Sequence, residues 1–79
     1  MEQQQYVVIE IQKLQDGTIS TIVTQHPNLK EALNKYHTVL AYAALSDLPR
    51  HSCAILDEAG FTVRNETFTA EVNGAEGSI

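Results

Sequence analysis

The sequence predicts an α+β fold of the ββαββ type: a four-stranded antiparallel sheet in the order 2-1-3-4, with one helix on a face. Three observations predict it. Only the stretch 28–46 has helical spacing of apolar residues, two strand-like stretches joined by Asp16-Gly17 precede it, and two more follow it. A helix that returns over the sheet brings the third strand beside the first, so the most apolar strands lie in the middle. We expect a single domain over residues 1–69 and a C-terminal tail over 70–79, flexible unless a partner orders it.

The first two strands are expected at Tyr6–Leu14 and Thr18–Gln25, where β-branched residues are frequent. Asp16-Gly17 predicts a two-residue hairpin turn, because Gly and Asp tolerate the positive φ that such turns need. This register directs one apolar set toward the helix: Val7, Ile9, Ile11 and Ile22. The opposite face is also unusually apolar, so this face too is expected to be covered. It carries Tyr6, Val8, Leu14, Ile19 and Val23.

The helix is expected to begin after Asn28, which stands three residues before Glu31 with the spacing of a capping box. Pro49 prevents it from continuing. One apolar stripe is predicted to pack on the sheet: Ala32, Leu33, Tyr36, Leu40 and Ala43. A second stripe is left over, and surplus apolar surface is typical of an interface. We therefore predict an oligomer interface at Val39, Tyr42 and Leu45.

After the helix, His51–Leu56 is predicted to be a strand, and its run of apolar residues indicates a central position. Gly60 is expected to adopt positive φ in the following turn. The more polar stretch Phe61–Thr69 is predicted to be the last strand, at an edge.

Composition limits the class of function. With 79 residues, a net charge of −5 and only five Lys and Arg residues, the chain lacks the basic field that duplex nucleic acid requires. Cys53 is the single cysteine, so no intramolecular disulfide is expected and oligomerisation is the remaining source of extra stability for so short a chain. The first residues do not resemble a leader peptide, and no apolar run reaches membrane-spanning length. We expect a cytoplasmic protein without membrane contact.

No sequence motif for catalysis is present, so no catalytic residue is assigned and a non-enzymatic protein is predicted. His26, His37 and His51 lack the spacing of zinc ligands, so neither a metal nor another cofactor is expected. His51 and Cys53 lie two residues apart on one strand face. One interpretation is a metal-binding or nucleophilic pair. The favoured interpretation is that Cys53 is a buried thiol and His51 a histidine at the strand end.

The segment from Lys30 to Arg50 holds three of the five cations and two of the three histidines, on an otherwise acidic chain. An anionic ligand in a pocket between subunits would suit such a segment. The candidate binding residues are Lys35, Tyr36, His37, Tyr42, Arg50 and His51. The alternative is that the two tyrosines pack in the interior and the charged groups are ordinary solvated side chains.

Four segments carry a family resemblance: the YVVIEIQ opening, the DGT turn, KYHTVL in the helix, and the PRHS stretch after it. Over about residues 6–60 the chain resembles a group of small phage and prophage proteins of gut Firmicutes. The resemblance implies a bacterial host cytoplasm. In that context, the surplus apolar helix surface and the cations around it favour a homo-oligomeric binding protein that counters host anti-phage defence, by sequestering a nucleotide immune signal or by inhibiting a defence protein. The alternative within the same context is an accessory protein of virion or tail assembly.

Overall fold

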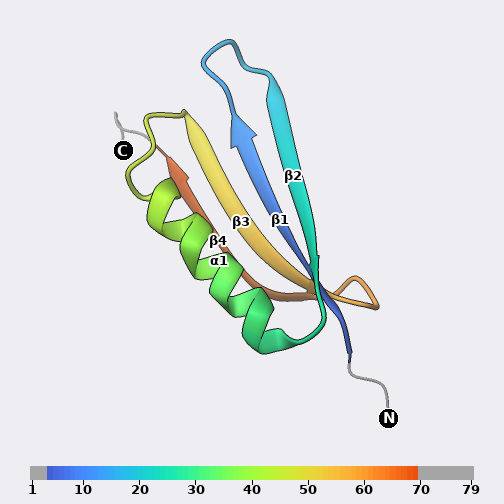
Figure 1. Ribbon diagram of the computed structural model, residues 1–79. Coiled ribbons are helices and arrows are strands. Elements are labelled where there is room, and N and C mark those ends of the chain that lie inside the picture. The colour runs from blue at the N-terminus through green and yellow to red at the C-terminus, as the bar shows by residue number, and fades with distance from the viewer. Residues whose placement is uncertain (1–3, 70–79) are drawn as a thin grey trace.

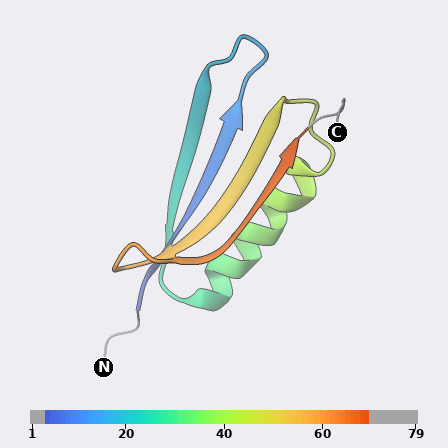
Figure 2. The same cartoon turned by 180° about the vertical axis from the view of Figure 1, so that it is seen from behind.

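The computed structural model describes residues 4–69, which form four antiparallel strands and one helix. The strands are β1 (Tyr6–Lys13), β2 (Ile19–His26), β3 (Arg50–Asp57) and β4 (Thr62–Thr69), in the order β2-β1-β3-β4. The helix α1 (Leu29–Ala43) lies along one face, and Figures 1 and 2 show this face and the uncovered one. The predicted α+β fold and strand order are confirmed. The predicted tail at 70–79 lies outside the described residues.

The start of α1 and the turn between β3 and β4 lie where the sequence predicts them. Asn28 caps α1, with extended backbone and a side-chain oxygen that accepts the Glu31 backbone N–H at 2.9 Å. Gly60 has φ of +90° in the turn between β3 and β4, as predicted. In the same turn the Asp57 carboxylate accepts the backbone N–H groups of Ala59 and Phe61.

The hairpin between β1 and β2 has a three-residue loop, and the predicted two-residue turn is wrong. Leu14 donates its backbone N–H to Thr18 at 2.8 Å, so these two residues close the loop. Gly17, at φ of +91°, supplies the left-handed residue that follows a tight turn in such loops. The shift by one residue sets Ile11 opposite Thr21 and pairs Ile9 with Val23.

The predicted assignment of the sheet faces is wrong for β1, whereas on β2 Ile22 lies on the helix side and Val23 on the uncovered face, as predicted. The core under α1 contains Val8, Cys53 and Ile55, with Tyr6 packed against it. Because side chains alternate along a strand, Val7, Ile9 and Ile11 lie on the uncovered face. The chain connectivity gives the physical reason. β2 and β3 run parallel on either side of β1, and α1 joins them by a right-handed crossover, the hand that such connections almost always take.

The helix is rotated slightly from the predicted orientation. Ala32, Tyr36, Val39 and Ala43 are its buried residues, whereas Leu33 and Leu40 are only partly buried at the margin of the core. Val39 is 4% exposed, so it belongs to the core and not to an outer stripe. Adjacent helix positions lie about 100° apart around the axis, so Val39 and Leu40 cannot both point at the centre of the core. A small rotation of the helix decides which of the two does.

The cap at the start of α1 gives the first prediction. Replacing Asn28 by Ala removes the acceptor for the Glu31 N–H, and we expect a loss of about 1 kcal/mol in the free energy of unfolding, measured by chemical denaturation. Asn34→Ala is the matched control, because Asn34 is exposed in the middle of the same helix. It should be neutral or slightly stabilising. Equal losses in the two variants would contradict the capping role.

Candidate functional site

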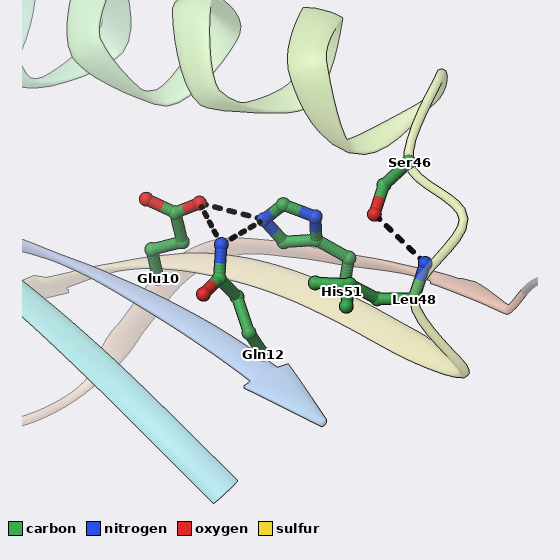
Figure 3. Close-up of polar contacts among 5 residues, drawn as sticks. All are labelled: Glu10, Gln12, Ser46, Leu48 and His51. Atoms are coloured by element: carbon green, nitrogen blue, oxygen red, sulfur yellow. Dashed lines mark hydrogen bonds and ion pairs between the residues drawn. The ribbon is translucent and has the colours of Figure 1, made fainter. Parts of the chain in front are cut away.

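A polar cluster lies between α1 and the sheet, on the face where a small domain normally places only apolar residues. It consists of Glu10 and Gln12 of β1 and His51 of β3 (Figure 3). The His51 Nε2 atom lies 2.6 Å from Glu10 Oε2, and the Gln12 side-chain amide donates to the same oxygen at 3.2 Å. The loop that leaves α1 passes above the imidazole, where the Leu48 backbone N–H donates to the Ser46 hydroxyl.

The short contact to Glu10 defines the proton on the imidazole. A carboxylate oxygen can only accept, so His51 Nε2 carries the hydrogen that joins the two groups. The Gln12 amide nitrogen, at 3.5 Å from Nε2, is then a neighbour and not a donor to the ring. The Nδ1 atom is buried without a hydrogen-bond partner among the described residues.

Cys53 lies beside this cluster, opposite Glu10 in the register of β1 and β3. Burial and, as a smaller cause, the negative charge of Glu10 together raise the pKa of the thiol to about 11. A thiol of this kind is almost entirely protonated near neutral pH. Since thiolates are the reactive form, this raised pKa favours the interpretation of Cys53 as a buried packing residue over that of a nucleophile.

The residues predicted to bind an anionic ligand do not form one site within the chain. Tyr36 and His51 are buried, and Lys35 is half-buried, whereas His37, Tyr42 and Arg50 are exposed. Arg50 alternates with His51 along β3, so it lies on the uncovered face of the sheet, where it pairs with Lys13 across the strands. Lys35 and His37 belong to α1 on the other side. Tyr36 packs in the core, with its ring edge-on to that of His37.

Two of the three predicted interface residues are exposed on the outer side of the helix. Tyr42 is 71% exposed and Leu45 is 85% exposed, while Val39 lies in the core as described above. Ala41 and Ala44 are exposed beside them. We call this group the outer helix patch, and define it as Ala41, Tyr42, Ala44 and Leu45.

Sequence reasoning missed Glu10 and Gln12 as partners of His51. The signal was present, because two polar residues at alternate positions interrupt an otherwise apolar strand. In the strand order β2-β1-β3-β4, these positions fall near His51 on the same face. The wrong face assignment placed them in solvent and concealed the contact.

Within residues 4–69, no group of three or more His, Cys, Asp or Glu side chains is arranged to hold a metal ion. The helix α1 is too short and too polar to cross a membrane. Comparisons of the chain with protein-family models, curated proteins and solved structures found no match. The site therefore has to be interpreted from its own geometry.

The position of Cys53 gives a prediction on reactivity. At pH 8 we expect iodoacetamide to modify native Cys53 at least about a hundredfold more slowly than the unfolded chain, because its pKa is about 11 instead of the usual value near 8.5. Mass spectrometry over time measures the rate. Asn34→Cys in a Cys53→Ala background is the control, since position 34 is exposed on α1 and should react at an ordinary rate. Rapid modification of native Cys53 would contradict the burial of the thiol.

The Glu10–His51 contact gives a second prediction. Replacing Glu10 by Leu removes the 2.6 Å contact to His51 Nε2 and leaves only the Gln12 amide nitrogen, at 3.5 Å, beside it. We expect a loss of about 1–3 kcal/mol in the free energy of unfolding. The double variant Glu10→Leu/His51→Phe should regain much of this loss, because an apolar pair replaces a buried polar one at little net cost. Urea denaturation of the single and double variants measures the coupling. Additive effects would show that the two side chains do not interact.

Proposed function

We propose that this chain is a small non-enzymatic binding protein of phage origin that works as a homo-oligomer and counters host anti-phage defence. Its target is a host defence protein, which it recognises through the outer helix patch. The single observation that carries the proposal is the exposure of Tyr42 and Leu45, large side chains that their own fold leaves in solvent. Tyrosine is one of the residues enriched at the energetic centre of protein interfaces.

The arrangement of the cations favours a protein target over a nucleotide. A nucleotide site would need several donors directed at one phosphate group. Here Arg50 lies on the sheet face opposite α1, and His51 is buried against Glu10, so neither is available beside Lys35 and His37. A flat patch with an aromatic residue suits a protein surface better than a charged small molecule.

The proposal predicts a specific loss of function. The test uses a panel of bacterial strains that each carry one defence system able to prevent plaque formation. In at least one of these strains, expression of the chain should allow phage to form plaques. Tyr42→Lys should abolish this rescue, because a charge at the centre of the patch opposes burial against the target. Plaque counts on the matched strains measure it. Rescue in none of the strains would oppose the defence role, and detection of the chain in purified virions would favour an assembly accessory.

Asn34→Lys is the matched control, since it introduces the same charge at another exposed position of α1. It should retain rescue, and circular dichroism should show that both variants are folded. Co-purification of a defence protein with the wild type, and not with Tyr42→Lys, would identify the target. A thermal shift with cyclic nucleotides that also disappears in Tyr42→Lys would instead favour the sequestration of a nucleotide signal.

A further inference from the structure

The uncovered face of the sheet is a continuous, largely apolar surface. It is formed by the residues that alternate with the core positions on β1, β2 and β3 and by the same side of β4. Ile19 is 57% exposed and Val23 is 60% exposed, and no described element packs over them. We call this surface the open sheet face; its apolar members are Val7, Ile9, Ile11, Ile19, Val23, Ala54 and Leu56.

Two pairs of polar side chains on this face bond to each other. The hydroxyls of Ser52 and Thr67 bond to each other at 3.0 Å across β3 and β4. The Gln25 amide donates to the side-chain oxygen of Gln5 at 2.6 Å. Polar side chains that bond to one another lose less when water is removed than side chains that bond to water. The centre of the open sheet face carries no charged side chain.

Charged residues of opposite sign lie at the two ends of the face, and Asp16 lies in the hairpin loop beyond the basic end. Lys13 and Arg50 stand opposite each other at the end where β1 leaves the sheet and β3 enters it. Glu58 lies at the other end, in the turn between β3 and β4, where its carboxylate accepts the Gln5 backbone N–H at 2.6 Å. A surface with an uncharged apolar centre and opposite charges at its ends is complementary to itself when one copy is reversed end to end.

We propose that the open sheet face is a self-association surface, on which a second copy of this chain packs face to face with its strands reversed. This inference deepens the proposed function, because it rests on the homo-oligomer stated there and names its interface. The reversed arrangement brings Lys13 and Arg50 of each copy toward the Glu58 end of the other. The unreversed arrangement would bring like charges together, which destabilises an interface.

The size of the face suits a dimer. Four strands of eight residues cover about 26 by 19 Å, or roughly 500 Å² on each partner. Two such faces bury roughly 1,000 Å², which reaches the lower limit for a specific protein interface. Sheets that pack face to face are about 10 Å apart, with side chains of both faces interdigitated. The helices would lie on the outside of the dimer, and each outer helix patch would remain free for a target.

Two variants on one strand test the surface. Val23 lies on the open sheet face, and its neighbour Ile22, 46% exposed, lies on the helix side of β2. We expect the full-length wild type to be a dimer by light scattering and sedimentation at high micromolar concentration. Val23→Lys should raise the dissociation constant by about tenfold or more. Ile22→Lys, with the same charge change, should leave it unaltered.

Three outcomes would overturn the proposal: a monomeric wild type, a dimer that Val23→Lys does not weaken, or one that Ile22→Lys weakens as much. Circular dichroism checks that both variants are folded. The orientation has its own test, because Lys13→Glu should weaken the dimer and Lys13→Glu/Glu58→Lys should restore it. Failure of the double variant to restore the dimer would overturn the reversed arrangement. Scattering needs no host or phage, so failure here is distinguishable from failure of the defence role.

Discussion

The right-handed connection from β2 through α1 to β3 decides which face of the sheet the helix covers. Chirality of the chain fixes this choice, and the apolar content of the two faces does not enter into it. Once the hand is set, Val8, Cys53 and Ile55 lie under the helix, and so do the polar side chains of Glu10 and His51. The aliphatic residues at alternate positions of β1 are left on the other side. The polar cluster and the open sheet face are therefore two consequences of one topological constraint.

Geometry also limits how much a single helix can shield. Fifteen residues of α-helix are about 22 Å long and about 10 Å wide, whereas the sheet is about 19 Å across its four strands. The helix covers the middle strands and leaves the edge strand β2 partly uncovered even on its own side, as the exposure of Ile22 shows. The core is consequently small, with only six residues in its buried cluster. A fold of this size gains from any additional layer.

The helix and the strands could be predicted from sequence because turn-forming, capping and proline residues mark their boundaries. Stretches with clear periodicity are separated by Asp16-Gly17, Pro27, Asn28, Pro49 and Gly60. The strand order follows from the connections between the elements. The faces could not be predicted in the same way. Tyr6 to Ile9 is an unbroken apolar run, so alternation gives no preference, and one residue of loop length moves the register of the hairpin. The error over Val39 has a similar origin, since Val39 and Leu40 are adjacent and packing decides which of them turns inward.

The distribution of polarity between the two faces bears most directly on function. In a two-layer domain, the face under the helix is normally apolar and the solvent face polar. Here the covered face holds a glutamate, a glutamine and a histidine, while the centre of the solvent face holds aliphatic side chains without any charge. The handed crossover prevents the chain from covering that face with its own helix. No other element within residues 4–69 packs over that face, and in the proposed dimer a second copy of the chain supplies the missing layer.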